Sequence, residues 1–203
     1  MSVFEYFGVR SRPEIFYYNT QPEYKPRALA IKLAELIREE MKGGKKGIVF
    51  LCIGTDRSTG DSLGPLIGHK LLERGLKGKA FRQAAVLGTL DRPVHAMNLE
   101  QYHAFVLKNF PDRVVVAIDA SVGNREHIGY VTLGKGALKP GLGVSKNLSE
   151  VGDIFITGIV GGCTSFDPVM LQSIRLSVVM HLADCICESI GLVENLWDFP
   201  PVI

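Results

Sequence analysis

Two aspartates that follow separate apolar segments carry the clearest chemical signal in this sequence. Asp61 comes after the apolar run 48–53 and a polar loop that contains glycine, and Asp119 comes directly after the run 114–118. Both runs are typical of buried β-strands. The carboxyl ends of parallel strands face one crevice, where ligands bind. Two carboxylates delivered there are what acid–base hydrolysis needs, one to accept a proton and one to donate it.

Each aspartate also has a structural interpretation. Asp61 stands where a helix begins and would cap it, and Asp119 would hydrogen-bond a neighbouring loop. If the pair is catalytic, the helix N-terminus lowers the pKa of Asp61 and favours its ionised form. Asp119, at the end of a buried strand, should be harder to ionise. The hypothesis is therefore that Asp61 acts as the base and Asp119 as the acid.

Small residues gather at the same expected edge of the sheet. They allow backbone to approach a ligand closely, and their amides could stabilise an oxyanion, as we expect for 141–144 or Gly161-Gly162. The alternative is ordinary turn chemistry. The expected substrate-binding positions are Thr55, Gly88, Thr89, Gly141, Gly143, Gly161 and Gly162.

Other chemistries have weaker support. The loop at 54–60 lacks the Walker A and dinucleotide-binding glycine patterns, which argues against a nucleotide. Cys163 follows two glycines and would need a base such as His127 to act as a nucleophile. A metal held by Asp61, Asp119 and His127 is a further alternative, although no histidine pair shows metal-ligand spacing.

Strand-like and helix-like segments alternate along the chain. Continuous Val/Ile runs between amphipathic segments predict a three-layer α/β/α sandwich with a mostly parallel sheet of about five strands. We expect one domain over 1–203, with the aromatic segment 1–24 packed on it as an arm. The expected strands are 48–53, 84–88, 113–118, a short edge strand at 129–133 and 153–160. We expect a helix that begins at Pro26 and ends at Gly43-Gly44, a second over 61–74 that stops at Gly75, and a third over 95–108. A long final helix should begin at Asp167-Pro168 and reach about Ile190.

Charge and composition narrow the partners. The net charge of +2 is close to neutral, so we expect no nucleic-acid partner. We find no signal-peptide pattern, and charged residues interrupt the apolar C-terminal region, so we expect a cytoplasmic protein that does not cross a membrane. The spacing of the cysteines indicates reduced, structural thiols. The sequence leaves a homo-oligomer open.

Three segments resemble a known family. The segment Thr59–Pro65, which reads T-G-D-S-L-G-P, is similar to the D-A-L-G-P segment of the spore germination protease family. Val115–Ala120 resembles the second aspartate segment of that family, and Pro140–Asn147 resembles its P-G-S-G-V-G-N stretch. The order and spacing match across roughly 47–165. The whole chain resembles still more closely the YyaC-type sporulation proteins, and both groups share the fold of the hydrogenase maturation proteases.

This resemblance implies a function. In the germination protease family the two matching aspartates are the proposed catalytic pair of an aspartic-type endopeptidase that cleaves small acid-soluble spore proteins, so Asp61 and Asp119 become candidates for that role. In the hydrogenase maturation proteases the position of Asp61 binds nickel together with another aspartate and a histidine. Those two groups have no counterpart at 86–89 and 144–147. We therefore expect no metal and no cofactor.

The favoured hypothesis is a sporulation-associated peptidase that uses two aspartates on a peptide or protein substrate. The alternatives are a sporulation factor that binds a protein or peptide through the same crevice without catalysis, and a metallohydrolase.

Overall fold

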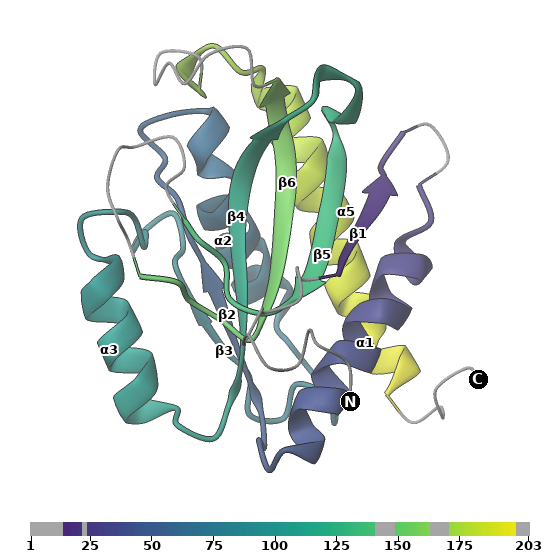
Figure 1. The fold of residues 1–203 in the computed structure, drawn as a ribbon, viewed down its shortest axis with the longest axis vertical. Helices are drawn as coiled ribbons and strands as arrows, with labels where there is room; N and C mark the ends of the chain where they lie inside the picture. Colours follow the sequence, from purple (N-terminus) through teal and green to yellow (C-terminus); the bar gives the residue numbers. More distant parts are fainter. Residues whose placement is uncertain (1–13, 22–23, 141–148, 163–170, 198–203) are drawn as a thin grey trace, which may run out of the picture.

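A six-stranded mixed sheet forms the centre of the protein in a computed structural model, which describes residues 14–21, 24–140, 149–162 and 171–197 (Figure 1). The strand order is β1-β5-β6-β4-β2-β3. The pairs β2–β3, β2–β4 and β4–β6 are parallel, and β5 runs antiparallel to both β6 and β1. The predicted parallel majority is therefore confirmed. The strands are β1 Ile15–Asn19, β2 Ile48–Cys52, β3 Ala85–Leu87, β4 Val114–Gly123, β5 Tyr130–Lys135 and β6 Ile154–Gly162.

Helices cover both faces of this sheet, as the sequence predicts. Three helices, α1 (Pro26–Lys42), α2 (Leu63–Arg74) and α5 (Leu176–Leu196), lie together on one face, and α3 (Leu99–Asn109) lies on the other (Figure 1). The result is the three-layer α/β/α sandwich.

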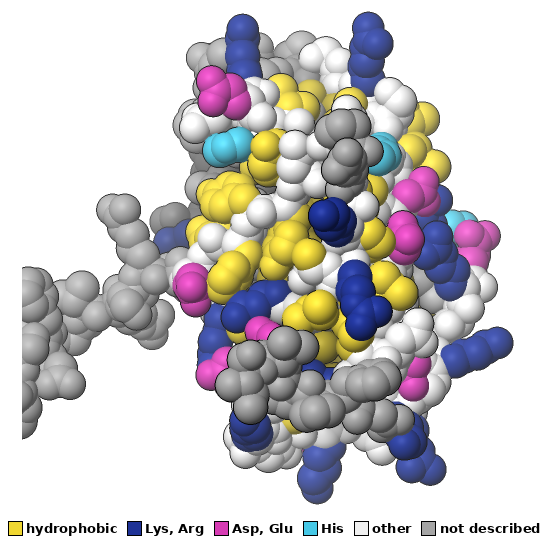
Figure 2. Space-filling view, turned by 90° about the vertical axis from the view of Figure 1, so that its right-hand side faces the viewer, with side chains coloured by type: hydrophobic (Ala, Val, Ile, Leu, Met, Phe, Trp, Pro, Cys, Tyr) yellow, Lys and Arg dark blue, Asp and Glu magenta, His cyan; other side chains and the backbone are white. Residues whose placement is uncertain are grey.

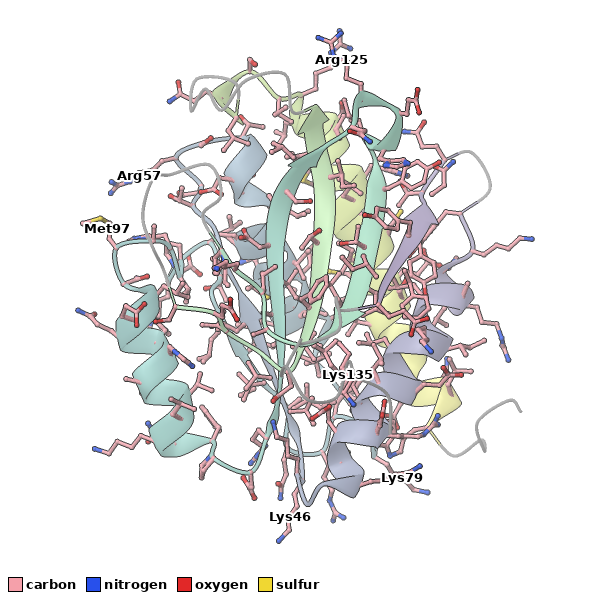
Figure 3. All side chains as sticks on the ribbon, viewed as in Figure 1. Lys46, Arg57, Lys79, Met97, Arg125 and Lys135 are labelled. Carbon is pink, nitrogen blue, oxygen red and sulfur yellow. The ribbon has the colours of Figure 1, made fainter. Side chains whose placement is uncertain are left out.

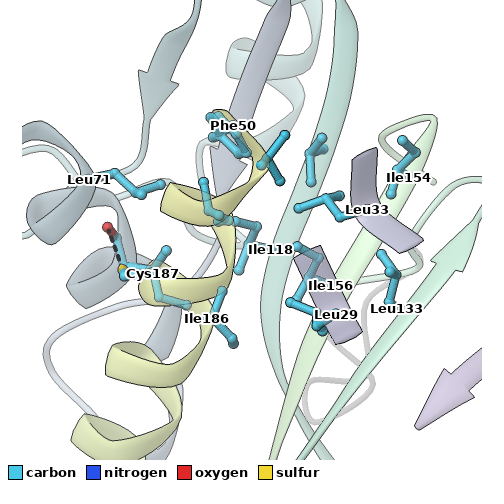
Figure 4. Close-up of a cluster of buried hydrophobic side chains, with 14 of the residues drawn as sticks. Leu29, Leu33, Phe50, Leu71, Ile118, Leu133, Ile154, Ile156, Ile186 and Cys187 are labelled. Carbon is cyan, nitrogen blue, oxygen red and sulfur yellow. Dashed lines mark hydrogen bonds between the residues drawn. The ribbon is translucent and has the colours of Figure 1, made fainter. Parts of the chain in front are cut away.

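The larger core fills the space between the sheet and the three-helix layer. Phe50, Ile118 and Ile156 point from successive strands toward Leu33 of α1 and Ile186 of α5 (Figure 4). All five side chains are fully buried. Burial of a side chain of this size stabilises the fold by roughly 1.5–3 kcal/mol. A smaller cluster under α3 contains Leu51, Val94, Leu99, Ala117 and Val151.

The C-terminal helix belongs to the larger core. By length and composition α5 is apolar enough to cross a membrane, but half of it is buried inside the fold, where it packs against α1 and α2. A core helix passes the same test of length and composition. Its predicted start at Asp167-Pro168 lies outside the described residues, but residues 173–175 are not helical, so α5 begins only at Leu176, and it ends at Leu196 rather than near Ile190.

The structure corrects three expectations about the elements. The sequence predicts that β5 is an edge strand, but β5 lies between β1 and β6. The reason is that the expected N-terminal arm contains a strand, β1, which pairs with β5. The strand at 113–118 continues to Gly123, so Asp119 lies within it. The helix expected over 95–108 begins only at Leu99, because Asn98 accepts a hydrogen bond from the His95 N–H and holds 95–98 in a turn.

The surface on the side of β1 and α1 carries hydrophobic side chains across its middle, with Lys and Arg side chains around and among them (Figure 2). The edge strand β1 contributes two exposed hydrophobic residues, Ile15 and Tyr17. This side of the sheet therefore ends in a partly apolar strand.

Candidate active site

The two aspartates lie where the direction of the chain through the sheet reverses. From β2 the chain passes through α2 to β3 on one side, and it then returns through α3 to β4 on the other side of β2. The loops that follow β2 and β4 therefore separate at their carboxyl ends, which is where open α/β sheets bind ligands. Asp61 comes from the loop after β2, and Asp119 comes from β4.

Close backbone packing fixes the position of Asp61. The residue lies in a short 3₁₀ turn, η2 (Gly60–Ser62), which leads directly into α2. The N–H of Thr55 donates to the Asp61 carbonyl oxygen at 3.0 Å. A Cβ atom on Gly54, whose φ is +142°, would stand 2.0 Å from the same oxygen. Glycine at position 54 thus allows the loop to close onto η2.

The rest of the D-S-L-G-P segment serves packing. The Leu63 side chain lies over Gly158 of β6, where an added Cβ would approach Leu63 Cδ2 to 2.4 Å. A Cβ on Gly64 would stand 2.0 Å from the Ile53 carbonyl oxygen, so only glycine lets α2 begin against the end of β2. The Ser62 hydroxyl donates to the Thr59 carbonyl at 2.7 Å. Asp61 is the one ionisable group of the segment, and the other residues hold it in place.

Asp119 lies on β4 at the point where β2 no longer runs beside it. The last residue of β2, Cys52, pairs with Ile118, whereas Asp119 pairs with Thr157 of β6 on the other side. The Asp119 side chain is buried, with 6% of the residue exposed. Its Oδ1 accepts a hydrogen bond from the Ala120 N–H at 2.8 Å. The carboxyl group is therefore held by the backbone of its own strand.

Burial and mutual repulsion disfavour ionisation of the pair. Burial raises the pKa of Asp119 well above its usual value, the charge of Asp61 raises it further, and the Ala120 N–H lowers it. Burial also raises the pKa of Asp61, against the lowering effects of His95 and of the Thr55 amide. The expected lowering of the Asp61 pKa by the helix N-terminus is wrong, because burial outweighs it. The expected order is retained, since Asp119 is the harder of the two to ionise.

A row of hydroxyl groups continues from Asp119 across the same face of the sheet. Thr157, its partner on β6, hydrogen-bonds Ser121 at 3.0 Å and Thr132 of β5 at 2.7 Å. Sequence reasoning did not select these residues. The signal was a Thr or Ser in each of three otherwise apolar strands, which becomes informative only when the strand order is known.

His95 was also missed as a site residue. The sequence predicts that it lies in a helix, but it lies in the turn before α3. There it lowers the pKa of the Asp61 carboxyl group. In the loop before Asp61, the buried Ser58 Oγ has no hydrogen-bond partner among the residues that the structure describes. An unsatisfied buried hydroxyl is uncommon in folded proteins.

The exposed side chains around the site point away from it. Arg57, in the loop before η2, and Met97, in the turn after His95, both extend outward from the ribbon (Figure 3). Met97 is 75% exposed. Of these neighbours it is His95, and not the exposed arginine, that lowers the pKa of Asp61.

The expected substrate-binding residues occupy different surroundings. Thr55 lies at the site, where its N–H donates to the backbone carbonyl oxygen of Asp61. The Thr89 hydroxyl accepts from the Arg92 N–H at 3.2 Å in a turn, and Gly88 packs against the Cys52 carbonyl. At the end of β6, Gly161 packs against Ile174 and Gly162 against Arg125. Gly141 and Gly143 lie outside the described residues.

The structure does not bring His127 to the aspartates. Its ring packs between Tyr17 and Tyr130, with centroid distances of 5.4 and 5.0 Å. Within residues 14–21, 24–140, 149–162 and 171–197, no group of three His, Cys, Asp or Glu side chains is placed to hold a metal ion. Cys163, the alternative nucleophile, lies outside the described residues.

Comparisons with known proteins place the chain in a family. A solved structure, the [NiFe] hydrogenase maturation protease HycI from Thermococcus kodakarensis KOD1, is similar at 18% identity with a TM-score of 0.41, over 78% of this chain and 98% of that one. The relative described as "Uncharacterized protein YyaC" from Bacillus subtilis (strain 168) is 43% identical over 154 residues, which are 76% of this chain and 73% of the relative. The family model described as "Protein of unknown function (DUF1256)" matches residues 21–189. The resemblance to YyaC is thereby confirmed, and the chain belongs to the DUF1256 family.

Proposed function

We propose that this protein hydrolyses peptide bonds with the Asp61–Asp119 pair. The observation that carries the proposal is the position of Asp61, in the turn after β2, and of the buried Asp119, on β4, at the reversal point of the sheet, where the charge of Asp61 also raises the pKa of Asp119. Two interacting carboxyl groups titrate in separate steps, so that one is ionised while the other still holds a proton. Acid–base hydrolysis needs this state.

The two environments assign the roles. Asp119 is the more buried and carries the more strongly raised pKa, so it keeps its proton and serves as the acid. Asp61 has the Thr55 amide and His95 to stabilise its charge, so it ionises first and serves as the base.

The reaction then follows from these protonation states. Asp61 takes a proton from water while the water oxygen bonds to the carbonyl carbon of the substrate. Asp119 donates its proton to the amide nitrogen as the C–N bond breaks. The new carboxylic acid returns a proton to Asp119, and Asp61 releases its proton to solvent.

The similarity of three segments to the germination protease family supports a specific substrate class. We propose that small acid-soluble spore proteins are cleaved in the cytoplasm of a sporulating cell. The cysteines in the described part of the chain, Cys52, Cys185 and Cys187, are free thiols, which is consistent with a reducing compartment.

A cleavage assay with the purified full chain tests the proposal. Unfolded peptides and acid-soluble spore proteins serve as substrates, and products are identified by mass spectrometry. Asp61→Asn and Asp119→Asn should each abolish cleavage, whereas the control Asp91→Asn, at an exposed turn, should cleave like the wild type. Cleavage that survives in both site variants would refute the catalytic pair. Intact substrate with the wild-type protein would favour the non-enzymatic binding factor.

A further inference from the structure

His95 lies beside the Asp61 loop because of a short stretch of strand-like pairing. Ile53, directly after β2, forms a parallel bridge with Val94, and the Gly54 N–H donates to the Val94 carbonyl at 2.8 Å. The next residue of that loop, Thr55, holds the backbone of Asp61. The residue after Val94 is therefore carried to the same end of the sheet as the two aspartates.

The surrounding backbone selects one orientation and one tautomer of the His95 ring. The Met97 N–H donates to His95 Nδ1 at 3.2 Å. A backbone amide can only donate, so Nδ1 must be the unprotonated acceptor, and the neutral ring carries its hydrogen on Nε2. The Asn98 side chain fixes the turn itself, since it accepts from the His95 N–H and donates to the Pro93 carbonyl.

The Nε2–H group retains its capacity to bind a ligand. His95 lowers the pKa of the Asp61 carboxyl group, so its ring lies within electrostatic range of that group. In the described part of the chain no hydrogen bond or ion pair joins the two side chains. His95 is half-buried, so part of the residue remains accessible to solvent.

We propose that His95 Nε2–H binds the carbonyl oxygen of the peptide substrate and stabilises the oxyanion that forms when water attacks. The proposal rests on the proposed function, and it gives the oxyanion a donor in the described structure. The alternative donors, the amides of Gly161 and Gly162, lie further along β6 than Thr157, which is the partner of Asp119. Gly161 pairs instead with Val122. A fixed donor at a developing negative charge acts mainly in the transition state.

Substitutions that separate the donor from the ring test this role. His95→Leu removes the donor, and kcat should fall by about 10²-fold while KM changes little. His95→Gln places an amide N–H near the position of Nε2 and should recover a large part of that loss. His103→Leu, on the neighbouring α3, is the matched control and should leave kcat unchanged. An unchanged kcat in His95→Leu, or equal losses in the Leu and Gln variants, would overturn the donor role.

A second measurement examines the tautomer without any substrate. A long-range ¹H–¹⁵N spectrum of the full-length protein should show the His95 ring protonated on Nε2 at a pH where it is neutral. A ring protonated on Nδ1 would exclude the proposal. The two levels of inference remain separable: a wild-type protein that cleaves nothing removes the proposed function and the His95 role with it, whereas normal cleavage by His95→Leu removes the His95 role alone.

Discussion

The charge of Asp61 raises the pKa of Asp119, although one residue lies in a 3₁₀ turn and the other lies within a buried strand. Coulombic coupling of this kind requires that the two carboxyl groups lie close together in a medium of low polarity. The carboxyl group in the turn after β2 and the one on the part of β4 that extends beyond β2 are therefore electrostatically coupled. Its properties can be measured even before a substrate is known.

Removal of the Asp61 charge should lower the pKa of Asp119. In Asp61→Asn the repulsion disappears while the burial remains, so the pKa of Asp119 should fall relative to the wild type but stay above the ordinary value. A ¹³C NMR titration of the aspartate carboxyl groups gives the shift directly. Asp91→Asn is the control and should leave Asp119 unaffected. An unchanged pKa in Asp61→Asn would show that the two groups do not interact.

Replacement of Asp119 should stabilise the protein increasingly as the pH rises. The pKa of this group is higher in the folded than in the unfolded state, so its contribution to stability is fully present below about pH 4 and is lost as the pH rises through the folded pKa. Asp119→Asn has no such loss. The difference in Tm between variant and wild type should therefore widen from pH 4 upward and then level off. A difference that is constant with pH would contradict this linkage.

Two serines beside Asp61 should respond in opposite directions to removal of their hydroxyl groups. Ser58→Ala deletes a buried oxygen that has no partner in the described part of the chain, and it should raise the free energy of unfolding by about 1 kcal/mol. Ser62→Ala deletes the donor to the Thr59 carbonyl and should lower it by about 1 kcal/mol. Urea denaturation of the two variants measures both effects. Loss of stability in Ser58→Ala would indicate that its hydroxyl has a partner in solution.

Glycine substitutions at two helix positions should also differ in sign. Gly64→Ala forces a methyl group against the Ile53 carbonyl at the start of α2 and should destabilise the protein by roughly 1–3 kcal/mol. At Gly191, in α5, an added methyl group would meet no described atom outside the neighbouring helix backbone within 4 Å, so Gly191→Ala should stabilise the protein by roughly 0.5–1 kcal/mol through helix propensity. Thermal melts at one pH give the comparison. Tolerance of Gly64→Ala would mean that α2 can shift away from β2.

Hydrophobic periodicity and the positions of proline and glycine residues predicted most of the fold. Pro26 and the double glycine that follows α1 marked that helix to within a residue, and Gly75 marked the end of α2. The N-terminal strand was not predicted, although Ile15–Asn19 is rich in aromatic and β-branched residues after a proline. Its strand character depends on pairing with β5, a contact between distant segments that local patterns do not contain.

The site was predicted in part for a related reason. Both aspartates could be selected because each follows an apolar run. His95 could not, since its place beside Asp61 depends on the single bridge between Ile53 and Val94. The direction of the Asp61 pKa shift was also out of reach, because a sequence shows a helix start but not the depth at which the carboxyl group is buried.

The pairing of β1 with β5 also bears on how the chain is made. Ile15 pairs with Gly134, so the first strand leaves the ribosome long before its partner exists. Until β5 is synthesised, the Ile15–Asn19 segment has no partner strand. Once β5 is present, the segment pairs with it and covers its edge. A nascent chain stalled before Tyr130 would thus hold a free strand, and a chain shortened past Asn19 would leave β5 as an open edge that can recruit another molecule. Pairing of β1 therefore has to wait until the chain has been synthesised through β5.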